Sequence, residues 1–220
     1  MCKRQSHSLI VNILTFSRIP LIFGYSFLAV IAHFKESLPL AIVSLLLMAA
    51  AAFTDLFDGK LARKWDVVST FGKLADPLMD KVFFIVAFPT LTWLIMASKN
   101  ESAFHGCLML AFTILYILRD QWVTFLRAVA SSYKADVSAM WLGKLRTALS
   151  FCASGVIYIY IFTTPYLLKN NLTSTINCFA YVVYSIEIAL ILLNLYSCIV
   201  YTKAYWPYMK MAITSDGKTK

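Results

Sequence analysis

The sequence is poor in charged residues, and acidic residues are the scarcer kind. Only 14% of its 220 residues are charged. Ordinary soluble domains contain about 25%. Apolar residues make up 60% of the chain, and there are only 7 glycines and 6 prolines. A water-soluble globular domain is therefore all but excluded, because so few charged side chains could not cover its surface.

Cysteine patterns typical of zinc sites or disulfide frameworks are also missing. The five cysteines form no C-x-x-C pair and lie mostly in apolar stretches, so we interpret them as small packing residues. They are Cys2, Cys107, Cys152, Cys178 and Cys198. No internal repeat or low-complexity segment is present. We therefore expect a single domain over residues 1–220, with a frayed tail from about 208 to 220.

Long apolar stretches are what the chain has in abundance. About 20 apolar residues are enough to cross the hydrocarbon core of a bilayer. Stretches of about that length lie at roughly 17–34, 38–62, 74–98, 103–130, 145–168 and 175–201. We therefore predict an all-α polytopic membrane protein with six transmembrane helices. Residues before about 16 can form a short interfacial helix.

Basic residues are distributed unequally between the two sides of these predicted spans. Of the 20 Lys and Arg residues, only Lys35, Lys99 and Lys169 lie in the connections on one side. Because the side rich in Lys and Arg normally stays in the cytoplasm, we predict that both termini are cytoplasmic. Arg18 interrupts the first apolar stretch and no small-residue cleavage site follows, so we expect this segment to be retained. The lack of an Arg- and Ser-rich leader favours a bacterial inner membrane.

Acidic residues gather in one part of the chain. Residues 55–81 read DLFDGKLARKWDVVSTFGKLADPLMDK. Two acids end the second predicted span and two open the third, namely Asp55 and Asp58, then Asp76 and Asp80. Helical residues three or four apart share a face, so a short loop can bring four carboxylates together. Such a cluster would repel itself without cations, and carboxylate oxygens are preferred ligands of hard divalent ions, so we predict a metal site.

Small and basic residues accompany these acids. Gly59 has no side chain where a flat group could approach the backbone, and Ala62, one turn later, has only a methyl group on the same side of the helix. Gly72 could let the third helix approach the second closely. Positive charge suited to holding phosphate is supplied by Lys60, Arg63 and Lys64.

This segment resembles the signature D-x-x-D-G-x-x-A-R-x8-G-x3-D-x3-D of the CDP-alcohol phosphatidyltransferases. Every fixed position matches: Asp55, Asp58, Gly59, Ala62, Arg63, Gly72, Asp76 and Asp80. The resemblance implies a six-helix membrane enzyme, commonly a homodimer, that displaces CMP from a CDP-linked lipid with two Mg²⁺ or Mn²⁺ ions. It implies that the four Asp residues bind the metals and that Asp80 is also the catalytic general base. The donor lipid would be bordered by Gly59, Ala62, Arg63, Gly72 and Thr15.

Further segments resemble the phosphatidylglycerophosphate synthases of that family. They are VNILTFSRIP, GKLADPLMDKV, ILRDQWVTFLR and WLGKLRTA. The resemblance implies CDP-diacylglycerol as donor and glycerol 3-phosphate as acceptor, with membrane lipids rather than nucleic acid as other partners. A phosphate-bearing acceptor needs cations near the metals, and the candidates are Arg119, Arg127, Lys144 and Arg146. Asp120, seven residues before Arg127, could hold that guanidinium in place.

Other interpretations of the sequence stay open. The acceptor could instead be phosphatidylglycerol, inositol phosphate or serine. Intramembrane acids also mark ion or solute transporters, although here they lie in one half of the chain and at the membrane boundary. The chain could also be a lipid-binding scaffold without activity. Arg18, Lys144 and Arg146 could reach lipid headgroups without binding substrate.

The last predicted span contains two unusual polar residues, Glu187 and Asn194. We expect Glu187 to be a structural acid that is protonated or paired with an arginine. Five aromatic residues near span ends are predicted to lie in the membrane interface: Trp65, Trp141, Tyr201, Tyr205 and Trp206. No spacing among the histidines indicates metal ligation.

Overall fold

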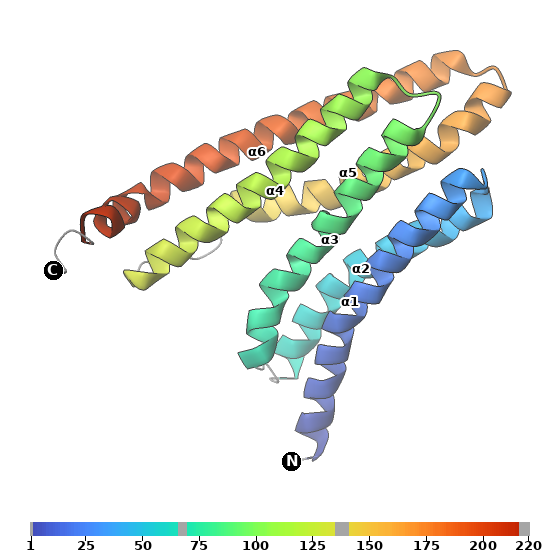
Figure 1. Ribbon diagram of the computed structural model, residues 1–220. Coiled ribbons are helices and arrows are strands. Elements are labelled where there is room, and N and C mark those ends of the chain that lie inside the picture. The colour runs from blue at the N-terminus through green and yellow to red at the C-terminus, as the bar shows by residue number, and fades with distance from the viewer. Residues whose placement is uncertain (1, 66–69, 135–140, 216–220) are drawn as a thin grey trace.

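The computed structural model describes residues 2–65, 70–134 and 141–215, and within them it contains six α-helices and no strand. Side chains are described for residues 13–54, 65, 78–79, 81–134 and 141–214. The helices are α1 (Cys2–Phe34), α2 (Leu38–Lys64), α3 (Thr70–Ala97), α4 (Ala103–Ser132), α5 (Trp141–Lys169) and α6 (Thr173–Ser215) (Figure 1). The all-α prediction is therefore confirmed for these residues.

The first and last helices are longer than the sequence predicts. Helix α1 runs without interruption from Cys2, so the residues before 16 continue the first helix and do not form a separate one. Helix α6 continues to Ser215, although a frayed tail is predicted from about residue 208. Pro207 lies inside α6, where it removes one backbone donor without ending the helix.

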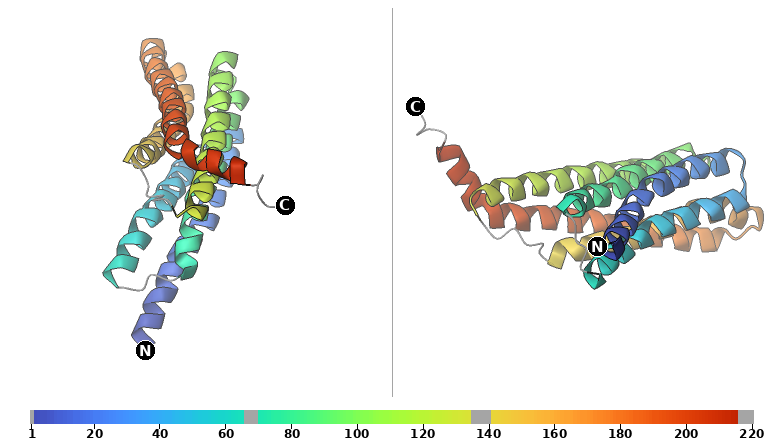
Figure 2. Two further views of the ribbon diagram at one scale, coloured as in Figure 1. Left: turned by 90° about the vertical axis from the view of Figure 1, so that its left-hand side faces the viewer. Right: turned by 90° about the horizontal axis from the view of Figure 1, so that it is seen from below.

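Successive helices run in alternating directions (Figures 1 and 2). The connections at residues 35–37, 98–102 and 170–172 lie at one end of the bundle, which we call the distal end. The last turns of α2, the first turns of α3 and both chain ends lie at the other, which we call the proximal end. Helix α1 packs on α2 and α3, whereas α6 packs on α4 and α5.

An aromatic core fixes α3 against α4. The ring centroids of Phe84 and Tyr116 lie 4.9 Å apart, and those of Phe88 and Phe112 lie 4.8 Å apart. All four side chains are buried, and tilted or edge-to-face ring pairs add to the stabilisation from apolar burial. This packing sets the positions of the two helices that bring the candidate site together.

Among the described residues, four stretches are long and apolar enough to cross a membrane, by length and composition: Ile13–Phe34, Ala103–Ser132, Trp141–Lys169 and Thr173–Thr214. The described apolar parts of α2 and α3 are shorter, at Leu38–Thr54 and Lys81–Ala97. Large apolar side chains such as Phe27 and Tyr181 are exposed on the helices, as expected for surfaces that face lipid. The chain is therefore a polytopic membrane protein.

A buried polar cluster links α4 to α6 near the distal end of α4. His105 Nδ1 lies 2.7 Å from Glu101 Oε2, and His105 Nε2 lies 3.0 Å from Glu187 Oε1. His105 and Glu187 are fully buried. The partner of Glu187 is thus a histidine and not the arginine that the sequence suggested. Ser102 caps α4 beside this cluster, because its side chain accepts a hydrogen bond from the backbone N–H of His105.

Candidate functional site

The four Asp residues predicted to bind metal belong to helices that meet at the proximal end. Asp55 and Asp58 fall in the last three turns of α2, and Asp76 and Asp80 fall in the first three turns of α3. The prediction that both pairs lie on helices is therefore confirmed. Their side chains lie outside the described residues, as do those of Gly59, Ala62, Arg63 and Gly72. The metal site and the donor-lipid contacts therefore stay predictions.

Lys81, the residue after Asp80, joins α3 to α4. Its Nζ donates a hydrogen bond of 2.8 Å to Thr124 Oγ1 and lies 3.9 Å from Asp120 Oδ2. Thr124 Oγ1 in turn donates to the backbone oxygen of Asp120 at 2.8 Å. The helix that carries the second pair of predicted metal ligands is thus attached, one residue further on, to a polar cluster on α4.

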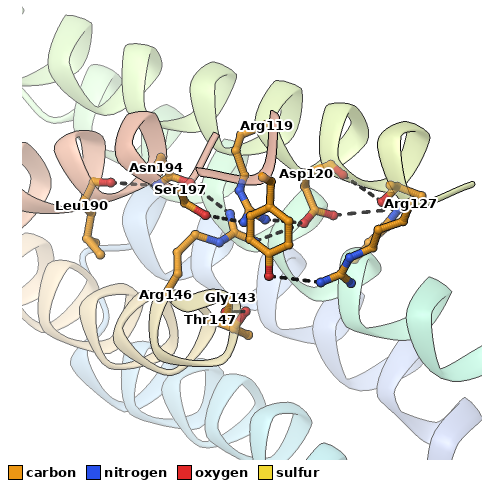
Figure 3. A network of polar contacts seen from close by, with 12 residues as sticks. Arg119, Asp120, Arg127, Gly143, Arg146, Thr147, Leu190, Asn194 and Ser197 are labelled. Carbon is orange, nitrogen blue, oxygen red and sulfur yellow. Dashed lines mark hydrogen bonds and ion pairs between the residues drawn. The ribbon is translucent and has the colours of Figure 1, made fainter. Parts of the chain in front are cut away.

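Asp120 is the central acceptor of that cluster (Figure 3). Its Oδ1 accepts a hydrogen bond from Arg146 Nη2 at 3.0 Å and lies 3.7 Å from Arg119 Nη1. Arg119 Nη2 also donates to Ser197 Oγ on α6. Arg119 and Arg146 are only 7% and 3% exposed. One carboxylate therefore holds cationic side chains from α3, α4 and α5 together.

Arg146 is held on three sides. Besides its bond to Asp120, its Nη1 donates to Asn194 Oδ1 at 2.9 Å. Asn194 Nδ2 donates to the backbone oxygen of Leu190 at 2.7 Å, which fixes the orientation of the amide. The guanidinium carbon of Arg146 lies 4.2 Å from the centroid of the Tyr116 ring. This side chain is buried and bound to Asp120 and Asn194, and it does not extend to lipid headgroups, so that alternative is wrong for Arg146.

Two guanidinium groups contact the ring of Tyr201 on α6. Arg127 Nη2 donates to the Tyr201 hydroxyl oxygen at 3.1 Å. The guanidinium carbons of Arg119 and Arg127 lie 4.9 and 5.1 Å from the ring centroid. The sequence suggested that Asp120 holds Arg127, and this prediction is wrong. Seven-residue spacing shows only that the two share a helix face, and a tyrosine from another helix is the closer partner of Arg127.

The predicted interfacial aromatics divide into two groups. Tyr201 and Tyr205 are 0% and 5% exposed, so the prediction that they lie in the membrane interface is wrong. Their rings face the interior of the bundle and stack with centroids 6.2 Å apart. Trp141 and Trp206 are exposed, which agrees with an interfacial position.

The remaining predicted residues occupy different environments. Thr15 and Arg18 on α1 are buried, so Arg18 does not extend along the surface towards headgroups. Lys144 is exposed in the first turn of α5, and within the described residues its side chain makes no hydrogen bond or ion pair with the cluster. The structure therefore brings together Arg119, Arg127 and Arg146, but not Lys144.

Positive charge exceeds negative charge in this cluster. Its described side chains comprise one carboxylate, that of Asp120, and four cations: Lys81, Arg119, Arg127 and Arg146. Unbalanced charge in a largely buried cluster is costly, and an anion that accepts hydrogen bonds from the guanidinium groups would offset that cost. The cluster is therefore a candidate anion-binding site beside the predicted metal ligands.

A mostly apolar cavity of about 320 Å³ lies between α4 and α6 next to this cluster. Its apolar lining consists of Leu115, Leu118, Trp122, Leu195 and Cys198. Arg119 and Asn194 form its polar part. A cavity of this composition favours a hydrocarbon chain over a charged group.

Sequence reasoning missed Lys81, Ser197 and Tyr201 as site residues, and noted Asn194 only as unusual. A usable signal was present in α6, because residues 194, 197 and 201 follow the i, i+3, i+7 spacing of one helix face. Polar side chains on one face of an apolar membrane helix normally face protein. That spacing therefore predicts a polar partner on a neighbouring helix.

Comparisons with known proteins point to one family. Residues 8–200 match the family described as CDP-alcohol phosphatidyltransferase. Three similar proteins are each named CDP-diacylglycerol–glycerol-3-phosphate 3-phosphatidyltransferase. The protein of Mycoplasma genitalium is 35% identical over 112 residues, which cover 51% of this chain and 42% of that protein.

The protein of Salmonella choleraesuis is 31% identical over 153 residues, which cover 66% of this chain and 73% of that protein. The protein of Rickettsia typhi is 32% identical over 126 residues, which cover 53% of this chain and 65% of that protein. The chain thus spans less than half of the first relative and about two thirds of the third. No solved structure matches the chain.

Proposed function

Because the chain belongs to the CDP-alcohol phosphatidyltransferase family, we propose that it transfers the phosphatidyl group of CDP-diacylglycerol to glycerol 3-phosphate. The products are CMP and phosphatidylglycerophosphate. The names of its relatives suggest both substrates. The observation that carries the proposal is the contact of Lys81 with Asp120, which joins the helix of Asp76 and Asp80 to a buried, positively charged cluster.

In this proposal Asp55, Asp58, Asp76 and Asp80 hold two divalent ions, Mg²⁺ or Mn²⁺. Carboxylates three and four residues apart on two touching helices are a suitable donor set for hard cations. When bound, the ions neutralise charge that grows on the departing CMP and draw electron density from the attacked phosphorus. The donor lipid is bordered by Gly59, Ala62, Arg63, Gly72 and Thr15.

Asp80 acts as general base in the proposed reaction. It takes the proton of the acceptor hydroxyl as that oxygen bonds to the phosphorus that carries diacylglycerol. The bond from this phosphorus to the CMP oxygen breaks, and CMP leaves with the electron pair. Lys81 follows Asp80 directly and contacts Asp120, so the base belongs to the same part of the bundle as the cationic cluster.

The cationic cluster binds the phosphate group of the acceptor. Two donors of Arg146 are already engaged by Asp120 and Asn194, so this residue mainly supplies charge. Arg127, with one side-chain hydrogen bond among the described residues, is better placed to donate to phosphate. Arg119 supplies further charge beside it, and exposed Lys144 adds charge at the start of α5. A phosphate monoester carries close to two negative charges at neutral pH, which offsets most of the excess positive charge.

Other acceptors remain outcomes of the test. Phosphatidylglycerol and inositol phosphate also carry phosphate, so the same cluster would suit them. Serine carries none and would leave the excess charge of the cluster unbalanced. A transporter is disfavoured because the chain belongs to a family of transferases. An inactive scaffold would have no need to retain all four Asp residues at the signature spacing.

We also propose the membrane arrangement that this reaction requires. All six helices have at least 27 residues, which is long enough to span a bilayer, so α2 and α3 complete six spans. The excess of Lys and Arg at the proximal end supports a cytoplasmic position for that end, with both termini and the site. The similar proteins come from bacteria, which supports a bacterial inner membrane. The homodimer is proposed from the family resemblance of the signature segment alone.

An acceptor comparison tests the proposal. The purified chain is incubated in detergent micelles with CDP-diacylglycerol, Mg²⁺ and one alcohol at a time, and CMP release is measured. We expect release with glycerol 3-phosphate at a rate at least about 100-fold above that with serine, because a site built for a charged group rejects a substrate that lacks it. Release with serine, inositol phosphate or phosphatidylglycerol but not glycerol 3-phosphate would overturn the choice of acceptor.

A further inference from the structure

Tyr201 is a buried tyrosine whose surroundings are not explained by apolar packing alone. It belongs to α6 and its side chain is fully buried. The guanidinium groups of Arg119 and Arg127 contact its ring. Two like charges near one ring repel each other, while the negative face of the ring attracts both. The ring therefore favours an arrangement in which the two cations stay close together.

Within the described residues of the cluster, the one side-chain hydrogen bond of Arg127 is to Tyr201, whereas Arg119 and Arg146 also contact Asp120. Arg127 Nη2 donates to the Tyr201 hydroxyl oxygen at 3.1 Å. Over the described ranges Arg127 has no carboxylate within ion-pair distance, and its buried Nε has no hydrogen-bond partner. Arg146, in contrast, is held by both Asp120 and Asn194. Arg127 thus retains hydrogen-bond donors and positive charge for an anion, and its hydrogen bond to Tyr201 fixes the orientation of its guanidinium group.

Gly143 on α5 makes room for the Tyr201 hydroxyl group. A Cβ atom at this glycine would lie 2.8 Å from the hydroxyl oxygen and 3.8 Å from the ring carbon that carries it. The first distance is too short for any side chain, whereas the second is ordinary contact. An alanine here would therefore push the hydroxyl oxygen away from α5, and the rigidly attached ring would tilt with it.

We propose that Tyr201 is a positioning residue that aims Arg127, together with Arg119, at the phosphate of the acceptor, and that Gly143 keeps its hydroxyl group in place. This inference rests on the proposed function. It names a specificity-determining contact on α6, outside the signature segment and outside the four cations predicted from the sequence. Neither residue touches the acceptor itself, so both act through Arg127.

Steady-state kinetics on the full chain test this role. The KM for glycerol 3-phosphate is measured for the wild type, Tyr201→Phe, Gly143→Ala and the double variant. We expect a rise of about 10-fold in Tyr201→Phe, the effect of losing one hydrogen bond to a charged group. The KM for CDP-diacylglycerol and kcat should change by less than about threefold, because the lost interaction concerns binding of the acceptor only.

The double variant makes the test specific. Gly143→Ala alone should raise the KM for glycerol 3-phosphate by about 10-fold, because it moves the hydroxyl group away from Arg127. In the Tyr201→Phe background the same change should have no further effect, because the atom that the new methyl group meets is absent. Equal effects of Gly143→Ala in both backgrounds would overturn the role given to Gly143 and the hydroxyl group.

Matched control variants exist on the same helices. Tyr205 lies one turn after Tyr201 on α6, and its ring stacks on that of Tyr201. Within the described residues the Tyr205 ring does not contact the arginines. Tyr205→Phe therefore removes a hydroxyl group close to the site without removing a contact to an arginine. Gly155→Ala adds a methyl group on α5 where nothing lies within 4 Å. Both should keep the wild-type KM for glycerol 3-phosphate. Inorganic phosphate, used as a competitive inhibitor, should lose affinity in Tyr201→Phe by the same factor as the acceptor.

The outcomes separate this inference from the proposed function. A wild-type chain that releases CMP with serine but not with glycerol 3-phosphate would overturn the proposed function. A wild type that uses glycerol 3-phosphate, with Tyr201→Phe unchanged in KM and in phosphate inhibition, would overturn the positioning role alone. Equal rises in the KM for both substrates would also overturn it, because they would indicate general damage to the fold.

Discussion

Asp120 on α4 accepts a hydrogen bond from Arg146 on α5 at 3.0 Å, and the same carboxylate lies within 4 Å of Arg119 and Lys81. Cationic side chains from three helices thus share the negative charge of one carboxylate. A carboxylate that faces several cations holds each of them more firmly than it would hold a single exposed partner, for which the gain is small. Asp120 therefore organises the cationic cluster.

Replacing Asp120 should destabilise the protein and loosen the cluster. In Asp120→Ala the three cations lose their shared counter-charge, so we expect the free energy of unfolding to fall by about 2 kcal/mol, less than for a fully buried pair because Asp120 is partly exposed. Thermal unfolding in detergent, followed by tryptophan fluorescence, measures the change. Asp120→Glu keeps the charge and should recover most of the stability. A Glu variant as unstable as the Ala variant would contradict the assigned role.

The distal cluster should matter for stability and not for substrate binding. In His105→Ala, buried Glu187 loses its hydrogen-bond partner, and leaving a buried acid without a partner typically costs about 3–5 kcal/mol. We expect a lower unfolding temperature, measured in the same fluorescence experiment, and an unchanged KM for both substrates at a temperature where the variant is folded.

Glu187→Gln serves as the control for that prediction. The amide keeps the size of the side chain and can still accept a hydrogen bond from His105, so its loss of stability should be smaller than that of His105→Ala. If either variant instead raised the KM for glycerol 3-phosphate, the two ends of the bundle would be coupled in a way that our structural assignment does not allow.

Much of the helical architecture could be predicted from the sequence, because apolar stretches long enough to span a bilayer have few alternatives to a helix. The predicted start at 38 agrees with the start of α2. The predicted ends near 34 and 168 agree with the ends of α1 and α5 to within one residue. The bounds of α6 were less accurate. Its last part is less uniformly apolar, so composition gives no sharp end there.

The partners of individual side chains could not be predicted in the same way. Spacing along one helix tells which residues share a face, but not which neighbouring helix covers that face. Spacing therefore favours Arg127 as the partner of Asp120, although the carboxylate contacts Arg146 on α5, Lys81 on α3 and the neighbouring Arg119. Likewise the pairing of Glu187 with His105 joins residues 82 positions apart. Aromatic character alone also could not distinguish buried Tyr201 from exposed Trp206.

Removal of divalent metal should abolish the reaction. We expect no CMP release after exhaustive treatment with a chelator, and recovery when Mg²⁺ or Mn²⁺ is added back, because in our proposal the ions neutralise the charge that grows on the departing CMP. The measurement is CMP release against free metal concentration. Turnover that persists without metal would contradict the proposed role of these carboxylates.

Asp80→Asn should stop turnover without preventing the chain from folding. The amide cannot accept the proton of the acceptor hydroxyl, so we expect kcat to fall by at least about 100-fold, the range typical for loss of a general base. Asp66→Asn, which changes an acid at a variable position of the signature segment, is the matched control and should keep wild-type kcat. Similar kcat values for the two variants would rule out Asp80 as the base.

The most direct test of the account is the KM for glycerol 3-phosphate in Arg127→Gln, compared with Lys169→Gln. Arg127 belongs to the buried cluster, whereas Lys169 is exposed at the distal end of α5. If the cluster binds the acceptor phosphate, the KM should rise at least about 10-fold in Arg127→Gln, as expected for loss of a charge-assisted hydrogen bond, and stay at the wild-type value in Lys169→Gln. The same KM in both variants would contradict the account.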